Sequence, residues 1–238
     1  MVEEVAPATG HPVVEEVALA TGGPVVEEVA LATVSKPRKL ALALTAVALA
    51  LTISGCGGDD QIQVGDLNGS VLDPPFTVST DELVGPGGAP YSLAESTDKP
   101  LTMVFFGYTN CPDICGTVMG NLASAMTRLD SKDRDRVDVV FVTTDPERDT
   151  EDVLRRYLDR YDKSFIGVTG PLEEIAAVGR SVAVGMGEKL PTGGYDVDAH
   201  TTQVTGIDGA DEAPIYWRQT TSSAQFAQDI HTLLASES

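Results

Sequence analysis

Two cysteines separated by three residues carry the clearest chemical signal in this sequence. The segment Cys111-Pro-Asp-Ile-Cys115 follows an apolar run over residues 101–106 and precedes a segment of helical periodicity. Both thiols are therefore expected at a strand-to-helix turn. A spacing of four positions can bring two sulfurs together in a turn or on one helical face. The pair can form a reversible disulfide or hold one soft metal ion.

The remaining cysteine and the three histidines differ in what they suggest. Cys56 ends an apolar N-terminal segment and has its own explanation there. His200 is a candidate nitrogen ligand, although a lone histidine is more often packed in a core or placed on the surface. His231 falls in a predicted C-terminal helix and is expected to be a surface or structural residue. His11 lies in a repetitive N-terminal segment.

The composition restricts the classes of partner. The formal net charge is −20, which argues against nucleic acid, because phosphate binding needs clustered Lys and Arg. An acidic surface that keeps the protein soluble explains this charge, and a basic partner protein is the alternative. Removing residues 1–55 takes away six acidic and three basic side chains, so the rest of the chain still carries −17.

The N-terminal segments are expected to act in targeting and not in the fold. Residues 1–33 repeat a twelve-residue unit and are a repetitive extension, which we interpret as a misassigned start, with translation beginning near Val34. Residues 34–55 combine a basic start with an apolar stretch of fourteen residues, as in a bacterial lipoprotein signal peptide. Ile53-Ser-Gly-Cys56 resembles a lipobox, which predicts lipidation at Cys56. An uncleaved membrane anchor is the alternative, and both place the domain outside the cytoplasm beside a membrane.

Residues 56–63 are expected to be a tether, and residues 64–238 a single α/β domain. Short edge strands and turns are predicted over residues 64–84, and a hairpin near residues 91–93. From residue 101 strands and helices alternate in a thioredoxin-like order, with a central mixed sheet flanked by helices. The predicted strands are residues 101–106, 137–143, 165–169, 195–207 and 214–218, and the predicted helices are residues 118–129, 150–161, 172–182 and 222–234.

Three segments together resemble the Sco/SenC family. They are Phe106-Gly-Tyr-Thr-Asn-Cys-Pro-Asp-Ile-Cys115, Thr144-Asp-Pro-Glu-Arg-Asp-Thr150 and His200. The resemblance implies a thioredoxin-like, membrane-tethered protein that binds copper and assists assembly of the dinuclear copper site of cytochrome c oxidase subunit II. It also implies that Cys111, Cys115 and His200 are the copper ligands.

The chemistry of these side chains agrees with the resemblance. Thiolates suit Cu(I), an imidazole suits Cu(I) or Cu(II), and thiolates near a helix N-terminus have depressed pKa values. Asp145 is a candidate for orienting His200, although it can equally cap the turn after a strand. Asp113 can tune the thiolates, contact a partner or simply belong to an exposed turn.

Three positions depart from the family pattern, and they bear on affinity more than on identity. Gly116 stands where a proline usually follows the second cysteine. Ala199 stands where the family often has an acid beside the histidine, and Gly206 stands at a commonly large, apolar position.

Other interpretations of the cysteine pair fit less well. The main alternative is a thiol-disulfide oxidoreductase, in which Cys111 attacks a disulfide of the oxidase subunit or another extracytoplasmic protein and Cys115 resolves it. The three-residue gap disfavours a general reductase, and Tyr108-Thr-Asn-Cys111 supplies only part of a peroxidase signature. A structural disulfide closing so short a loop contributes little. We therefore expect a copper metallochaperone, and not primarily an enzyme.

Overall fold

The computed structural model describes residues 67–187, 196 and 200–236. The chain divides into two units, Met1–Ser54 and Gly55–Ser238, and all described residues belong to the second. The predictions for the repetitive extension, the signal peptide, Cys56 and the tether lie outside the described residues. Among the described helices, none is both long and apolar enough to cross a membrane.

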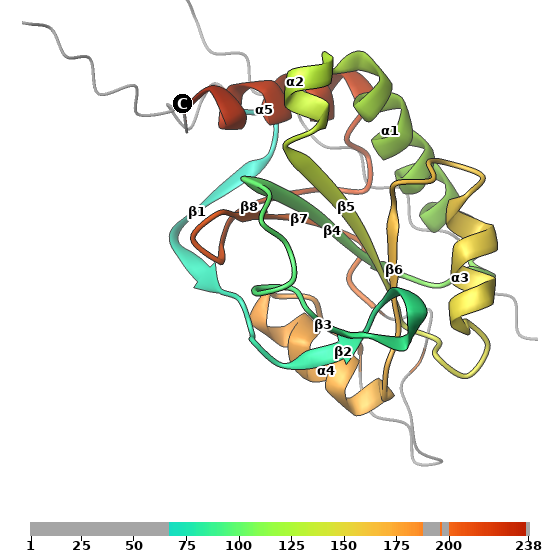
Figure 1. The fold of residues 1–238 in the computed structure, drawn as a ribbon. Helices are drawn as coiled ribbons and strands as arrows, with labels where there is room; N and C mark the ends of the chain where they lie inside the picture. Colours follow the sequence, from blue (N-terminus) through green and yellow to red (C-terminus); the bar gives the residue numbers. More distant parts are fainter. Residues whose placement is uncertain (1–66, 188–195, 197–199, 237–238) are drawn as a thin grey trace, which may run out of the picture. The chain divides into compact units, whose positions relative to one another are not determined.

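A six-stranded mixed sheet forms the centre of the domain (Figure 1). At its middle β4 pairs parallel with β5 and antiparallel with β7, and β5 pairs parallel with β6. The mixed pairing confirms the predicted thioredoxin-like arrangement. In spatial order the strands are β1 (Ser70–Thr77), β8 (Glu212–Trp217), β7 (Val204–Asp208), β4 (Leu101–Gly107), β5 (Val137–Thr143) and β6 (Ile166–Val168).

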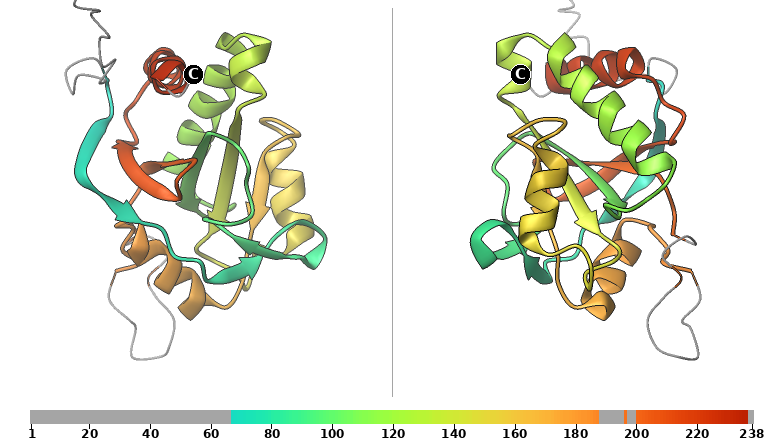
Figure 2. Two further views of the ribbon diagram at one scale, coloured as in Figure 1. Left: turned by 60° about the vertical axis from the view of Figure 1, so that its left-hand side comes forward. Right: turned by 90° about the vertical axis from the view of Figure 1, so that its right-hand side faces the viewer.

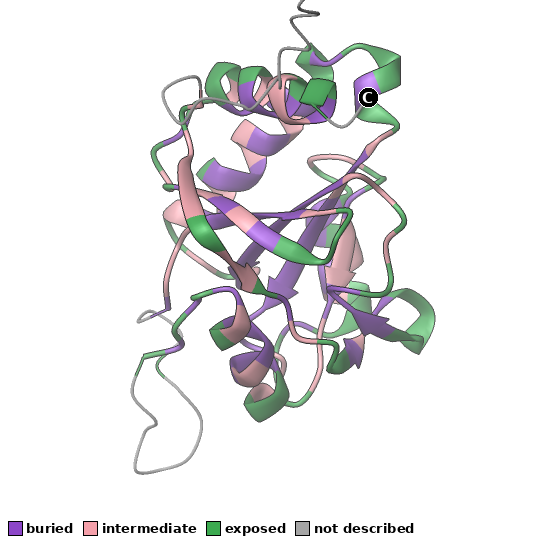
Figure 3. Cartoon of the chain, turned by 90° about the vertical axis from the view of Figure 1, so that its left-hand side faces the viewer, coloured by how far each residue is buried: buried purple, intermediate pink, exposed green. Residues whose placement is uncertain are grey.

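Both faces of the sheet are covered, which explains why β4 is apolar along its whole length. Phe105 and Phe141 face a core formed with α1 (Ile114–Arg128), α3 (Glu151–Leu158) and α5 (Ser223–Ser236). Phe106 and Val142 face the opposite core, formed with α4 (Leu172–Ser181) and a hairpin of β2 (Glu82–Val84) and β3 (Pro90–Ser92). The helices lie on both sides of the sheet (Figure 2), and the central strands are almost entirely buried (Figure 3).

Several boundaries differ from the predictions. The expected short edge strands include one eight-residue strand, β1, which pairs with β8 across an irregularity and contains a cis bond at Asp73–Pro74. The strand expected over residues 195–207 begins at Val204, and before it the Thr201 backbone N–H donates to the Gly185 carbonyl at 2.9 Å instead of joining a strand ladder. A short helix, α2 (Ser131–Arg134), was not predicted; its four polar residues give no periodic signal. The N-terminal hairpin is confirmed.

Candidate metal centre

The first cysteine lies on a tight turn after the central strand. β4 ends at Gly107, and the Cys111 N–H donates to the Tyr108 carbonyl at 3.2 Å, which closes the turn. Asp113 is the N-cap residue of α1, but its side chain makes no capping hydrogen bond. Its carboxylate is exposed and leaves the first amides of α1 to other acceptors.

One of those acceptors is the sulfur of Cys111. The Cys115 backbone N–H donates to Cys111 Sγ at 3.5 Å, so the two cysteines lie together as predicted, with both thiols free. Cys115 is fully buried, whereas Cys111 is half-buried. Gly107 permits this packing, because a Cβ there would lie 3.0 Å from Cys115 Sγ and 2.9 Å from the Phe105 ring.

The two thiols differ in acidity. Burial works to raise the pKa of Cys111, but hydrogen bonds from the Cys115 thiol and from the backbone N–H groups of residues 113–115 outweigh it, so the pKa of Cys111 is lowered. Burial, together with the hydrogen bond to Cys111, raises the pKa of Cys115 to about 12. Cys111 is therefore the more readily ionised thiol, and its lowered pKa agrees with the prediction for a position near the helix N-terminus. The same prediction is wrong for Cys115, whose pKa is raised.

His200 lies on a neighbouring segment beside the turn. Its ring is buried and meets the Tyr108 ring edge to face, with the centroids 6.1 Å apart. His200 Nδ1 lies 3.1 Å from the Thr201 carbonyl oxygen. Because a carbonyl only accepts, Nδ1 carries a proton in this contact.

The structure assembles the predicted ligand set only in part. In residues 67–187, 196 and 200–236, no three His, Cys, Asp or Glu side chains gather closely enough to hold a metal ion. Cys111 and Cys115 are in contact with each other. His200 contacts the ring of Tyr108, which lies in the same turn, but it does not form one cluster with the two cysteines. Two sulfurs and one imidazole nitrogen remain a donor set that fits a soft metal. The three-ligand site stays a prediction.

The partner of the Asp145 carboxylate in the structure is Arg148. The carboxylate accepts from Arg148 Nε, and the Asp145 backbone N–H donates to the Thr143 hydroxyl at 2.9 Å. The orientation of His200 by Asp145 therefore stays a prediction without a contact to support it. His231 forms a 2.6 Å contact with Asp133 and is largely exposed, which confirms its predicted surface role.

Two residues at this site were missed by sequence reasoning. Asp149 is fully buried and binds Thr109, two residues before Cys111, through the backbone and the hydroxyl. Both residues lie inside the two segments that carry the family resemblance. The available signal was therefore Thr109, a polar residue just before Cys111. Thr109 and Asp149 are separated by 40 residues in the sequence, so the sequence alone does not indicate that they are in contact.

Of the two departures at described glycines, one has a structural explanation. At Gly116 a Cβ would lie 3.4 Å from the Tyr161 hydroxyl, an ordinary contact, so nothing in the packing requires glycine there. At Gly206 a Cβ would lie 2.8 Å from Ile215 and 2.9 Å from Trp217, whose side chains fill the space. Ala199 lies outside the described residues.

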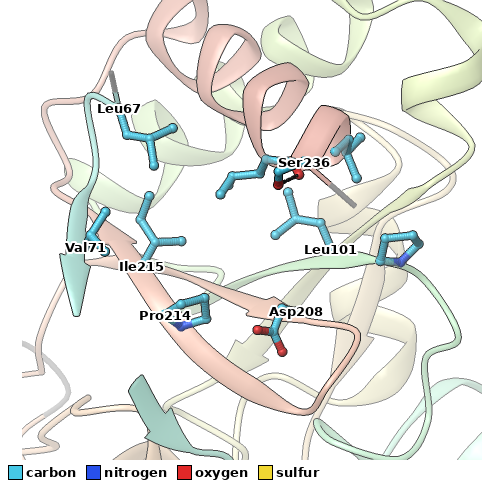
Figure 4. A pocket seen from close by; sticks show the side chains of 10 residues that line it. Leu67, Val71, Leu101, Asp208, Pro214, Ile215 and Ser236 are labelled. Carbon is cyan, nitrogen blue, oxygen red and sulfur yellow. Dashed lines mark hydrogen bonds between the residues drawn. The ribbon is translucent and has the colours of Figure 1, made fainter. Parts of the chain in front are cut away.

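A hollow of about 240 Å³ lies at the other end of β4, beside its first residue Leu101 (Figure 4). Leu67, Ile215 and Leu234 contribute apolar walls, and Asp208 and Ser236 are the polar lining residues. No cysteine or histidine lines it, so the thiol chemistry belongs to the turn after β4.

Comparison with known proteins matches the SCO1/SenC family model over residues 79–235. A protein of Stutzerimonas stutzeri named as copper-binding is 30% identical over 173 residues, which cover 72% of this chain and 84% of that protein. The solved apo Sco1 of Thermus thermophilus has 27% identity and a TM-score of 0.60, covering 70% of this chain and 96% of that one.

Copper-bound ScoI of Bradyrhizobium japonicum has 27% identity and a TM-score of 0.54, covering 65% of this chain and 97% of that one. The chain spans about a third of the length of several mitochondrial relatives that it matches. The family match covers most of the chain and includes the cysteine turn, the Asp145–Thr150 segment and His200. The chain therefore belongs to the SCO1/SenC family.

Proposed function

We propose that this chain is a copper-binding metallochaperone that assists assembly of the dinuclear copper site of cytochrome c oxidase subunit II. The observation that carries the proposal is the contact between Cys111 and Cys115, with one sulfur half-exposed and the other buried. The named copper-binding relative and the copper-bound ScoI support copper as the metal. The oxidase subunit as partner rests on the family resemblance.

The donor chemistry favours Cu(I) capture at this turn. Thiolates are the preferred soft ligands of Cu(I), and the lowered pKa of Cys111 favours the thiolate form of this ligand. Cys115 must lose its proton on capture, because a bound metal deprotonates its thiol ligand. In this proposal an imidazole nitrogen of His200 supplies the third donor. A low-coordinate site of this kind can release its ion to another protein.

The location follows from the N-terminal sequence. The basic and apolar segment over residues 34–55 and the lipobox-like Cys56 support export and lipid anchoring at the outer face of a bacterial cell membrane. A lipid-anchored domain on that face shares a compartment with the exposed copper domain of an oxidase subunit.

The first experiment is an anaerobic titration of the reduced full-length protein with Cu(I), in competition with a chelator of known affinity. One-to-one binding is expected. His200→Ala should weaken it about 10-fold or more, because it removes a ligand. His231→Ala is the matched control, since it removes the other described imidazole and its contact with Asp133 without touching the cysteine turn.

Equal affinities of the wild type and His200→Ala would remove His200 from the ligand set. Weak Cu(I) binding by the wild type, combined with ready cycling of a Cys111–Cys115 disulfide, would reject the copper proposal. The chain would then be assigned as a thiol-disulfide oxidoreductase.

A further inference from the structure

Asp149 is a fully buried carboxylate whose hydrogen bonds converge on the turn that carries Cys111. Asp149 Oδ2 accepts from the Thr109 backbone N–H at 2.8 Å and from the Thr143 hydroxyl at 2.7 Å. Asp149 Oδ1 accepts from the Thr109 hydroxyl at 2.5 Å. A buried carboxylate is stable in such a place only because several donors replace its water.

The donors come from two different parts of the site. Thr109 is the second residue of the turn that the Cys111 N–H closes on the Tyr108 carbonyl. Thr143 is the last residue of β5 and pairs with Gly107, the last residue of β4. The Thr144 N–H also donates to the Gly107 carbonyl at 2.7 Å. Asp149 therefore ties the outer edge of the turn to the ends of the two central strands.

We infer that Asp149 is a positioning residue that fixes the Thr109 corner of the turn and thereby holds the Cys111 sulfur opposite Cys115 for metal capture. The inference rests on the proposed copper function for the identity of the metal, but the positioning itself does not. Asp149 does not touch either cysteine. It acts through Thr109, whose backbone and side chain it holds at once.

The physical reason is the cost of ordering a loop at the moment of binding. A free turn would have to lose backbone entropy when the metal arrives, and that loss would be subtracted from the affinity. Cys115 needs no such help, because it is buried in α1. Only the outer cysteine depends on a turn, so only the outer cysteine needs a support of this kind.

The test compares two near-isosteric substitutions in the full-length protein, Asp149→Asn and Asp229→Asn. Asp229 is a matched control, because it is also fully buried and accepts from backbone and side-chain N–H groups, those of Asn68, Gly69 and Trp217. Each substitution keeps the side-chain size and removes one acceptor oxygen. Cu(I) affinity, the alkylation rate of Cys111 and the free energy of unfolding are measured for both variants.

Both variants should lose stability, but only Asp149→Asn should change the cysteine site. We expect Cu(I) affinity about 10-fold to 100-fold lower in Asp149→Asn, in the range measured for residues that orient metal ligands, and an altered Cys111 alkylation rate. Asp229→Asn should retain both values. An Asp149→Asn protein that is folded and keeps wild-type affinity and alkylation overturns the inference, and so does an equal loss in Asp229→Asn.

Thr109→Val gives an independent route if Asp149→Asn does not fold. It removes the hydroxyl bond and leaves the Thr109 amide bond and the Thr143 bond in place. A smaller loss of Cu(I) affinity in the same direction supports the inference, and an unchanged affinity overturns it. If the wild type itself binds no Cu(I), the proposed function fails, and the alkylation rates alone decide whether Asp149 positions Cys111.

Discussion

Two fully buried carboxylates, Asp149 and Asp229, bind different strands of the sheet with similar chemistry but different consequences: Asp149 accepts from Thr143 of β5, and Asp229 accepts from Trp217 of β8. Asp229 lies on α5 and accepts from Asn68 at 2.7 to 3.0 Å, from Gly69 at 2.9 Å and from Trp217 at 2.7 Å. These donors belong to the start of the described chain and to β8. Asp149 accepts from a turn that carries a reactive thiol.

The comparison shows that burial of a charged group does not by itself mark a functional site. Around Asp229 every donor is part of a packed element or leads into one, so the carboxylate secures the fold. Around Asp149 the same kind of bonding is used to hold Cys111 in place. The two carboxylates differ in what their hydrogen-bonded segments carry, because only the segment bound by Asp149 carries a cysteine of the candidate site.

The strongest way to sharpen the comparison is Cys111→Ser in the turn that Asp149 binds. Loss of the half-buried sulfur should abolish one-to-one Cu(I) binding in the competition titration, because a hydroxyl is a poor ligand for Cu(I). The free energy of unfolding should change by less than about 1 kcal/mol, since the side chain is nearly the same size. Retained tight binding would show that the metal site lies elsewhere.

The complementary change is Asp229→Ala on α5. It leaves the Asn68, Gly69 and Trp217 donors without their acceptor, so the free energy of unfolding should fall by about 3 kcal/mol. Denaturant unfolding measures this loss, and the Cu(I) affinity of the folded fraction should match the wild type. A parallel fall in Cu(I) affinity would mean that the hydrogen bonds of Asp229 are coupled to the cysteine turn.

Two glycines allow the same comparison with a single added methyl group. In Gly206→Ala the new Cβ meets Ile215 and Trp217, and in Gly107→Ala it meets Phe105 and Cys115 Sγ, all at 2.8 to 3.0 Å. Each should cost about 2 kcal/mol of stability by overpacking. Only Gly107→Ala should also slow Cu(I) capture in stopped-flow measurements. Equal copper kinetics in the two variants would contradict this.

The smallest expected effect concerns the pH dependence of thiol alkylation. The reactive species is the thiolate, so the rate at each cysteine rises with pH and levels off above its pKa. For Cys111 the rise should come below the ordinary thiol value of 9.0, because its pKa is lowered, whereas Cys115 should stay unreactive until about pH 12. Mass spectrometry of alkylated peptides over pH 6–10 separates the two, and modification of Cys115 first would contradict the assignment.

The central elements and the cysteine pair could be predicted from the sequence because their signals are local. The apolar run of β4 indicated a strand buried on both faces, and the spacing of Cys111 and Cys115 indicated a shared turn. Thr150 was predicted to start a helix and is the N-cap of α3, although its side chain makes no capping bond.

Contacts between distant segments could not be predicted in the same way. Asp149 appeared to be one of several polar residues before a helix, and nothing local identifies Thr109 as its partner. The pairing of β1 with β8 joins Ser70 to Tyr216, and its register shifts between Val71 and Phe76. The contact between Tyr108 and His200 likewise depends on how β4 and the segment before β7 are brought together by the sheet.

The unequal burial of the two sulfurs gives any exchange at this turn a direction. Cys115 is fully buried on α1, while Cys111 is only half-buried. Under the proposed function, a ligand from a partner protein would meet the more exposed sulfur first and would displace it while the buried sulfur still held the ion. The ion would then enter and leave by the same side of the turn.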